Sequence, residues 1–261
     1  MKVDYKLVQK RRDDIMILIQ KLGKISSSVL AKEFNVSEIT IRRDLQYWED
    51  KGAILRYHGG AKIVEKRVET DEKLNNERYK RAIAKYAAQL VNDGDTIFIN
   101  SSSTALLVIE YLVHKRVNVI TNNARAIHIK HDPLVTINLT GGELRYPKEV
   151  MVGEIALQTL SKIIADKCFL GCSGIDTENG MTTAILSEVP INEKFVNKCK
   201  GEVFVLCDYT KINQKYSFIS APLEDISYLI TDINAPKIEL EEFNDKKVKT
   251  VTLEPLPYNF K

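Results

Sequence analysis

The chain has 261 residues and a formal net charge of +3, and this length accommodates two compact domains. It contains no run of about 18 apolar residues, and its start, MKVDYKLVQKRRDD, has no apolar core. We therefore expect neither a membrane span nor a signal peptide, and a cytoplasmic location. Residues 1–66 contain fourteen Lys or Arg against nine Asp or Glu, whereas the rest contains twenty-four against twenty-six. A basic excess at one end favours contact with nucleic acid there.

Two short helices are predicted between residues 15 and 35. Apolar residues at the spacing of one helix face define the first helix: Ile15, Leu18, Ile19 and Leu22. Gly23 is then a stop signal, and the serines at 26–28 offer hydroxyl caps to the second helix. Three side chains of the second helix are expected to point inward: Val29, Leu30 and Phe34.

Ser37 caps a third predicted helix, and the two faces of this helix differ in chemistry. The apolar face is formed by Ile41, Leu45 and Trp48. On the opposite face, arginine can bind guanine through two hydrogen bonds, glutamine can pair with adenine, and isoleucine can contact a thymine methyl. Hydroxyls at the helix N-terminus can hold a phosphate. The residues of this helix that we expect to contact DNA are Ser37, Ile39, Thr40, Arg42, Arg43 and Gln46.

A two-stranded wing is predicted after the third helix. Gly52 breaks the helix, residues 54–56 have the pattern of a strand, and the glycine pair permits a hairpin that returns over residues 61–64. We expect four wing residues at the DNA: Arg56, His58, Gly59 and Gly60. Residues 1–66 are therefore predicted to form a winged helix-turn-helix domain.

The runs SEITIRRDL and LRYHGGA resemble the DNA-binding domain of the DeoR family of bacterial transcription regulators. In that family the arginine pair lies in the recognition helix and the glycine pair in the wing. The residues that occupy family positions are Ser37, Thr40, Ile41, Arg42, Arg43, Asp44, Leu45, Arg56, His58, Gly59, Gly60 and Ala61. The resemblance implies double-stranded operator DNA as a partner. Since a palindromic operator needs a symmetric reader, we expect a homodimer or homotetramer.

A second domain is predicted over residues 76–261, after a polar linker at 67–75. Six β-rich runs recur along it: TIFIN, VNVIT, VTINL, KCFLG, VFVLC and YLIT. Helical patterns at residues 105–112, 124–130 and 150–164 alternate with the first of these runs. Such alternation indicates a parallel sheet covered on both faces, so the fold class is α/β.

Polar and small residues follow several of the predicted strands. Ligands of parallel sheets bind beyond the carboxyl ends of the strands, and hydroxyls, a glycine turn and two cations at one edge are suited to an anion such as phosphate. Arg145 and Lys211 are the predicted charge partners. The full set expected to bind the effector is Asn100, Ser101, Ser102, Ser103, Thr104, Asn122, Asn123, Gly141, Gly142, Glu143, Arg145, Asp208 and Lys211.

The second domain is also similar to the DeoR-type effector domain, through VITNN, LTGGELR, FLGCSGID and the region of Glu188. That domain is related in fold to ribose-phosphate and glucosamine-phosphate isomerases. Family members mostly repress sugar-catabolism operons and are released by phosphorylated sugars, and the resemblance implies the same here. One loop departs from the family pattern, which has Asp, any residue, Gly and two Ser/Thr. This chain has Asn100 in place of the carboxylate and Ser102 in place of the glycine.

Two other functions use the same residues. A sugar-phosphate isomerase with an appended DNA-binding module would need paired acid and base groups, for which the candidates are Asp176, Glu178, Glu188 and Asp208. An activator would use the same sites as a repressor. Because a shared fold does not carry function, we expect no enzyme and no catalytic residue.

The four cysteines, at 168, 172, 199 and 207, do not have zinc-site spacing. Cys168 and Cys172 are separated by three residues, with no histidine nearby, and Cys168 and Cys207 fall in apolar strand-like runs. We therefore expect reduced thiols rather than a metal site. No cofactor is expected.

Overall fold

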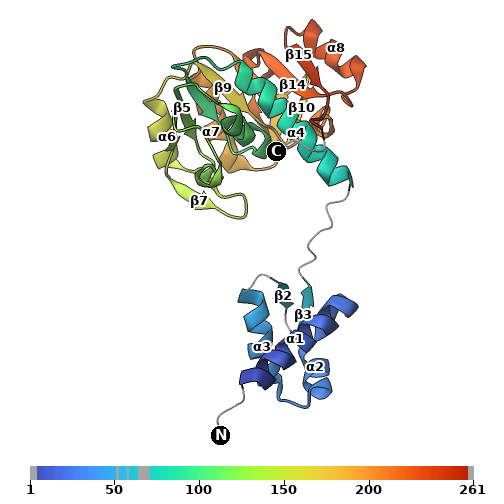
Figure 1. The fold of residues 1–261 in the computed structure, drawn as a ribbon. Coiled ribbons are helices and arrows are strands. Elements are labelled where there is room, and N and C mark those ends of the chain that lie inside the picture. The colour runs from blue at the N-terminus through green and yellow to red at the C-terminus, as the bar shows by residue number, and fades with distance from the viewer. Residues whose placement is uncertain (1–4, 51–52, 58, 64–70, 258–261) are drawn as a thin grey trace. The chain divides into compact units, whose positions relative to one another are not determined.

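The computed structural model describes residues 5–50, 53–57, 59–63 and 71–257, and the chain divides into two compact units, Met1–Thr70 and Asp71–Lys261 (Figure 1). Within the described ranges, no helix is long and apolar enough to cross a membrane.

The N-terminal unit has the predicted winged helix-turn-helix fold. Its helices are α1 (Tyr5–Leu22), α2 (Ser27–Glu33) and α3 (Glu38–Asp50). Its strands are β1 (Lys24–Ser26), β2 (Ile54–Tyr57) and β3 (Gly60–Ile63), joined as an antiparallel sheet in the order β1-β3-β2. The β2–β3 hairpin was predicted, whereas β1 was not; β1 pairs with β3 from Lys24 opposite Lys62 to Ser26 opposite Gly60.

The core of this unit joins all three helices to the wing. Its completely or almost completely buried side chains include Ile15, Ile19, Leu30, Ile41, Leu45 and Ile54. Two residues predicted to face inward do not: Leu22 is exposed at the end of α1, and Val29 is 51% exposed. The Ser26 hydroxyl caps α2 by accepting a hydrogen bond from the Val29 N–H at 3.3 Å. Because α2 begins after this cap, Ser27 and Leu30 lie on its inner face and Val29 lies on its outer face.

A buried carboxylate fastens α1 to α3. Asp44 is 2% exposed and accepts hydrogen bonds from Arg11 Nε at 2.7 Å and Arg12 Nε at 3.0 Å. The Arg12 guanidinium also lies 4.2 Å from the centre of the Tyr47 ring, and Trp48 Nε1 donates to the Arg12 carbonyl at 2.8 Å. These contacts fix the orientation of the recognition helix.

The C-terminal unit is built on a seven-stranded parallel sheet, which confirms the α/β class. The strand order is β15-β14-β12-β9-β4-β5-β6. The strands are β4 (Thr96–Ile99), β5 (Val117–Thr121), β6 (Val135–Leu139), β9 (Lys167–Leu170), β12 (Val203–Leu206), β14 (Tyr228–Asp232) and β15 (Lys249–Leu253). The six predicted runs are all strands of this sheet, and β15 was not predicted.

Helices cover both faces of the sheet (Figure 1). Side chains alternate along β4, so Ile97 and Ile99 join one core with α4 (Asp71–Gln89), while Phe98 joins the other. The second core also includes residues of α6 (Glu154–Ser161), α7 (Val189–Asn197) and α8 (Lys237–Asp245). The central strands are therefore buried on both sides, and only their ends can form a site.

Short elements complete the unit. A three-stranded antiparallel sheet has the order β10-β11-β13, formed by β10 (Gly174–Asp176), β11 (Gly180–Thr183) and β13 (Phe218–Ala221). The first predicted helix is a short α5 (Ser103–Leu106) followed by a 3-10 helix (Leu107–Tyr111), and the second is a 3-10 helix (Ala124–His128).

The predicted helix over residues 150–164 is wrong in its first turn. Residues Val150–Val152 form β8, which pairs antiparallel with β7 (Glu143–Arg145), and the helix α6 begins only at Glu154. Gly153, at a φ of +89°, makes the change of direction between strand and helix. A run of three apolar residues does not distinguish a strand from a helix.

Replacement of Asp44 by alanine is expected to destabilise the N-terminal unit by about 2 kcal/mol, because it leaves two partly buried guanidinium groups without their acceptor. Trp48 is the sole tryptophan of the chain, so its fluorescence during urea unfolding reports on this unit. Asp13→Ala is the matched control: Asp13 is an exposed residue of α1, the helix that carries Arg11 and Arg12, and its carboxylate accepts only from Gln9, at 3.0 Å, among the contacts described. It should change stability by less than about 0.5 kcal/mol. Equal effects of the two substitutions would contradict the role of Asp44.

Candidate functional site

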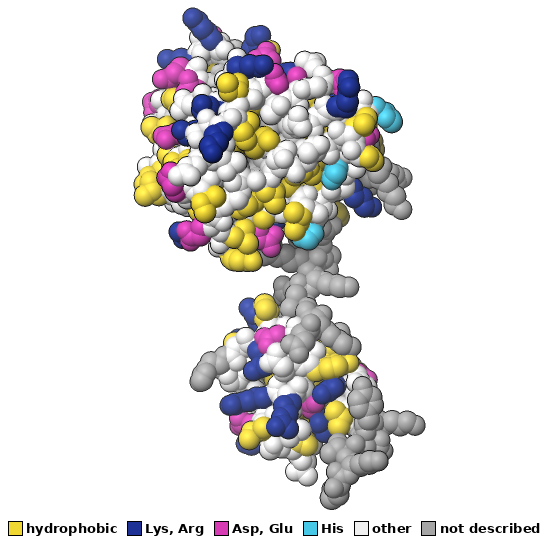
Figure 2. All heavy atoms as spheres, turned by 90° about the vertical axis from the view of Figure 1, so that its left-hand side faces the viewer, with side chains coloured by type: hydrophobic (Ala, Val, Ile, Leu, Met, Phe, Trp, Pro, Cys, Tyr) yellow, Lys and Arg dark blue, Asp and Glu magenta, His cyan; other side chains and the backbone are white. Residues whose placement is uncertain are grey.

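The exposed face of α3 carries the side chains predicted to contact DNA. Ile41 and Leu45 are buried, whereas Ile39 is 64% exposed and Arg42, Arg43 and Gln46 are exposed with it. Ile39 is therefore accessible to a thymine methyl, the contact predicted for it. The face of the N-terminal unit seen in Figure 2 carries several Lys and Arg side chains among apolar ones.

The two hydroxyl groups at the start of α3, on Ser37 and Thr40, are hydrogen-bonded to each other. Ser37 Oγ accepts a hydrogen bond from the Thr40 N–H at 3.2 Å and lies 3.0 Å from Thr40 Oγ1. The pair therefore caps the helix in the free protein. Both side chains retain lone pairs or a proton for one further partner.

The cations near α3 differ in their partners. Arg42 lies 3.8 Å from Glu38. Arg56 of β2 donates to the Gln46 carbonyl oxygen and lies 3.5 Å from Glu49, so the wing docks on the helix through two predicted DNA contacts. Arg43 makes neither a hydrogen bond nor an ion pair within the described part of the chain. It is the cation of α3 that is free to bind an external group.

The glycine pair of the wing has a steric role. Gly59 has a φ of +95°. A Cβ atom on Gly60 would lie 2.4 Å from the Ile25 carbonyl oxygen and 2.7 Å from Tyr57 Oη. Gly60 is buried, so it shapes the hairpin and exposes no surface for DNA. His58, also predicted to contact DNA, lies outside the described residues.

The C-terminal unit contains a cavity of about 240 Å³ where β4, β9 and β12 end. These three strands are neighbours in the sheet, so the loops that follow them surround one space. Six predicted effector residues line it: Ser101, Ser102, Ser103, Thr104, Asp208 and Lys211. The cavity lies where parallel sheets bind ligands.

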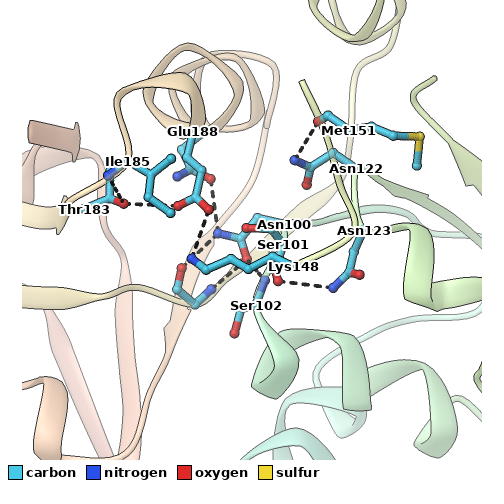
Figure 3. A network of polar contacts seen from close by, with 12 residues as sticks. Asn100, Ser101, Ser102, Asn122, Asn123, Lys148, Met151, Thr183, Ile185 and Glu188 are labelled. Atoms are coloured by element: carbon cyan, nitrogen blue, oxygen red, sulfur yellow. Dashed lines mark hydrogen bonds and ion pairs between the residues drawn. The ribbon is translucent and has the colours of Figure 1, made fainter. Parts of the chain in front are cut away.

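Asn100 lies beneath the cavity and joins its walls (Figure 3). Its amide nitrogen donates to the Gly171 carbonyl at 2.8 Å and to Asn192 Oδ1 at 3.1 Å. Its carbonyl oxygen accepts from the N–H groups of Gly171 at 2.9 Å and Ser102 at 3.2 Å. Asn100 is 2% exposed, and with these bonds it has a structural role at the site.

Ser102 and Gly171 are in direct contact across the cavity floor. Ser102 Oγ caps α5 by accepting from the N–H groups of Thr104 at 3.1 Å and Ala105 at 3.3 Å. A Cβ atom on Gly171 would lie 1.9 Å from Ser102 Oγ and 2.2 Å from Ser102 Cβ. The serine at position 102 therefore requires a glycine at position 171.

The charged groups of the cavity fall into two kinds. Lys148 Nζ lies 3.1 Å from Glu188 Oε1, while Glu188 Oε2 accepts from Thr183 Oγ1 at 3.1 Å (Figure 3). Lys80 and Lys211, by contrast, have no ion pair or hydrogen bond from their side chains to another described residue. Two ammonium groups are thus available to an anion.

Seven predicted effector residues do not line this cavity. Asn100 lies beneath it, and Asn123 donates to the Ser101 carbonyl at 3.2 Å from a neighbouring hollow. Asn122 is buried and donates to the Met151 carbonyl at 3.1 Å. The others belong to the turn before β7 and to β7 itself: Gly141, Gly142, Glu143 and Arg145.

Arg145 differs most from its prediction as a charge partner of the effector. It lies 3.0 Å from Glu143, and both side chains are more than half exposed. β7 pairs with β8, so the chain turns away from the sheet edge after Thr140 and carries Arg145 outward. Gly142 is needed for that turn: it has a φ of +106°, and a Cβ atom on it would lie 2.5 Å from the Val152 carbonyl oxygen.

Nine residues of the cavity wall were absent from the predicted site: Lys80, Arg125, Lys148, Gly171, Cys172, Ser173, Glu188, Leu206 and Cys207. The loop at 171–173 could have been found, since it follows the predicted strand KCFLG. Lys80 lies on α4, before the first strand of the sheet, and Lys148 lies in the β7–β8 connection. Neither lysine follows a predicted strand of the parallel sheet, so the local sequence did not place either of them at the site.

Together, the winged helix-turn-helix unit and the α/β unit with its polar cavity define a DNA-binding transcriptional regulator with a sensor domain. Residues 11–67 match the DeoR-like helix-turn-helix domain, and residues 75–233 match the DeoR C terminal sensor domain. The chain belongs to the DeoR family of transcriptional regulators, which is a family of regulators rather than enzymes.

The chain matches its relatives over nearly their whole length. The HTH-type transcriptional regulator YulB of Bacillus subtilis (strain 168) is 32% identical over 256 residues, which cover 96% of this chain and 98% of that protein. A lactose phosphotransferase system repressor of Staphylococcus epidermidis is 31% identical over 233 residues, covering 86% and 92%. Among solved structures, ribose 5-phosphate isomerase A of Methanocaldococcus jannaschii gives a TM-score of 0.38 at 20% identity, over 54% of this chain and 56% of that one. That likeness is too low to transfer any property.

Gly171→Ala is expected to destabilise the C-terminal unit by about 1–3 kcal/mol, because the new methyl group overlaps Ser102. In a Ser102→Gly background the same substitution should cost clearly less, since the two nearest atoms belong to the Ser102 side chain and the third, the Leu206 carbonyl oxygen, is 3.3 Å from the added Cβ. Ser102→Gly alone should cost a few tenths of a kcal/mol, about the loss for a Ser-to-Gly cap. The double-mutant cycle is measured by urea unfolding followed by far-ultraviolet circular dichroism. A coupling energy near zero would disprove the steric link.

Proposed function

We propose that the protein is a repressor of a sugar-catabolism operon: α3 and the wing bind operator DNA, and a phosphorylated sugar in the cavity releases it. The observation that carries the proposal is the presence, beside a hydroxyl-rich loop in the sensor domain of a helix-turn-helix protein, of two lysines, Lys80 and Lys211, whose side chains pair with no described residue. A lactose phosphotransferase system repressor among the relatives supports sugar as the class of signal.

The phosphate of the effector is assigned to Lys80, Lys211 and the loop at 101–104. Lysine is a common phosphate ligand, and an ammonium group without a carboxylate partner loses no ion pair when the anion binds. The hydroxyls of Ser101 and Ser103 line the same cavity and can donate to phosphate oxygens. Four hydrogen-bond donors around one space match the several acceptor oxygens of a phosphate.

The sugar is assigned to the side of the cavity with Glu188 and Asp208. Carboxylates accept hydrogen bonds from sugar hydroxyls but repel phosphate, so they orient the ligand within the cavity. Glu188 is held by Thr183 and Lys148 and keeps acceptor sites free. Asp208 accepts from the Thr210 N–H at 3.1 Å and from the Thr210 hydroxyl through one of its oxygens, Oδ1. Its other oxygen remains for a ligand.

Two of the four residues that could serve an isomerase as acid or base lie outside this cavity. Asp176 accepts from the N–H groups of Glu178 and Asn179 at 2.8 Å each and so closes the β10–β11 turn. Glu178 is exposed and pairs with Lys215 at 2.6 Å. Only Glu188 and Asp208 of the four candidates line the cavity, and Asn100 cannot act as a base.

A symmetric oligomer completes the proposal, because a dimer can present two α3 helices to a palindromic operator. Exposed apolar side chains lie on β6, on and just after β7, and at the start of α6, where a second copy could cover them: Leu139, Leu144, Tyr146 and Ile155. Effector binding would then change the spacing of the two recognition helices.

The function is tested by anisotropy titration of the protein on its own upstream region, at fixed salt, with a panel of phosphorylated and free sugars. We expect sequence-dependent binding that one phosphosugar relieves. Lys211→Ala and Lys80→Ala should leave DNA affinity unchanged and raise the half-releasing concentration about tenfold, equivalent to about 1.4 kcal/mol. Lys215→Ala, which removes an exposed lysine outside the cavity wall, serves as the control. If no sugar alters binding, the assignment of the cavity fails.

Arg43→Ala should weaken operator binding and relax the preference for one base by about 1–3 kcal/mol, because an arginine fork can read guanine. The measurement compares the variant and the parent protein on the operator, on single-base substitutions of it and on a scrambled duplex. An equal loss on all duplexes would instead assign Arg43 to a phosphate. Unchanged affinity would remove it from the interface.

A further inference from the structure

Two cysteines lie just beyond the ends of neighbouring strands. In the β9–β12 pair, the last paired residues are Leu170 and Val205, and the same offset continued along both chains would place Cys172 opposite Cys207. The two thiols lie within hydrogen-bonding reach of each other. Since paired strands lie about 4.8 Å apart and a disulfide needs Cα atoms about 4.4–6.8 Å apart, strand ends at this spacing suit one.

The side chains of these cysteines lie on the same face of the sheet. Cys168, Leu170 and Cys172 alternate along one chain segment, and Val203, Val205 and Cys207 alternate along the other. All six belong to, or pack against, the same hydrophobic core. Both Cys172 and Cys207 also line the cavity. Both residues therefore border one space that small molecules can enter.

The environments of the two thiols differ. Cys207 is buried, and both the adjacent Cys172 thiol and this burial raise the pKa of Cys207 well above its usual value. Cys172 is partly exposed toward the cavity. Cys172 is thus the thiol that reacts first with a reagent from solvent, and Cys207 is the neighbouring thiol that reacts second.

We propose that Cys172 and Cys207 are a modification site, which a peroxide converts into an intramolecular disulfide in the wall of the cavity. The Cys172 sulfur attacks one peroxide oxygen, so that an S–O bond forms, the O–O bond breaks and one water leaves. The Cys207 sulfur then attacks the Cys172 sulfur, so that the S–S bond forms and the second water leaves. Two thiols lose two electrons and two protons, and hydrogen peroxide is reduced to two waters.

The bond would join the two loops that carry much of the cavity wall. An S–S bond of about 2.05 Å would fasten the segments after β9 and β12 to each other. Lys211 lies in the second of these segments, four residues after Cys207. The site therefore couples the redox state of the protein to the rigidity of the cavity wall, whatever ligand the cavity holds.

The test treats the folded full-length protein with hydrogen peroxide, blocks remaining thiols, and digests with trypsin without reduction. Cleavage after lysine places Cys207 in residues 201–211, Cys199 in 199–200, and both Cys168 and Cys172 in 168–194. We expect the 168–194 and 201–211 peptides as one species, two hydrogens lighter than their sum, which dithiothreitol separates.

The variants identify the partners. Cys168→Ala should retain the cross-link and Cys172→Ser should abolish it; Cys199→Ser is the matched control and should leave it intact. Cys207 is buried, so it is replaced by alanine, which keeps this position apolar. Circular dichroism verifies that the Cys207→Ala variant folds. A cross-link that persists without Cys172, one that involves Cys199, or oxidation of Cys172 to an acid with no cross-link would each overturn the proposal.

Discussion

The side chain of Asn100 holds the site of the C-terminal unit together. It donates to the Gly171 carbonyl and to Asn192, and it accepts from the N–H groups of Gly171 and Ser102. A carboxylate at this position could accept the same two bonds but could not donate the other two, and it would face two acceptor oxygens. The amide therefore joins β4, β9 and α7 in a way that an aspartate could not.

The contact between Ser102 and Gly171 also constrains the site that Asn100 holds together. The family pattern places a glycine where this chain has Ser102, and the serine side chain fills space directly against Gly171. Ser102 gains a helix cap, while Gly171 must remain without a side chain. The two departures from the family loop are thus structural, and they leave the hydroxyls and lysines around the cavity available to a ligand.

The sequence predicted the elements that local patterns define. Six strands were found because each is a short apolar run followed by polar residues, and the recognition helix was found because Ile41 and Leu45 alternate with exposed polar side chains. β8 was missed because three apolar residues fit either a strand or a helix.

Only six of the fifteen residues that line the cavity were predicted, for a different reason. Loops after strands can be located from sequence, but Lys80 and Lys148 come from a helix and a hairpin that only the tertiary fold brings to these strand ends. Arg145 lies close to the predicted edge in sequence, yet its strand turns outward. Proximity along the chain therefore did not predict which cations share a space.

The Asp44 contacts also affect how the N-terminal unit would respond to salt. Residues 1–66 contain fourteen Lys or Arg, but Arg11 and Arg12 bind Asp44, while Arg42 and Arg56 each have a glutamate nearby. Salt weakens DNA binding in proportion to the number of phosphates that a protein neutralises, since each contact releases condensed counterions. A cation that is already bound to a carboxylate releases fewer of these counterions when the protein binds DNA. The salt sensitivity of operator binding should therefore be lower than the number of basic residues implies.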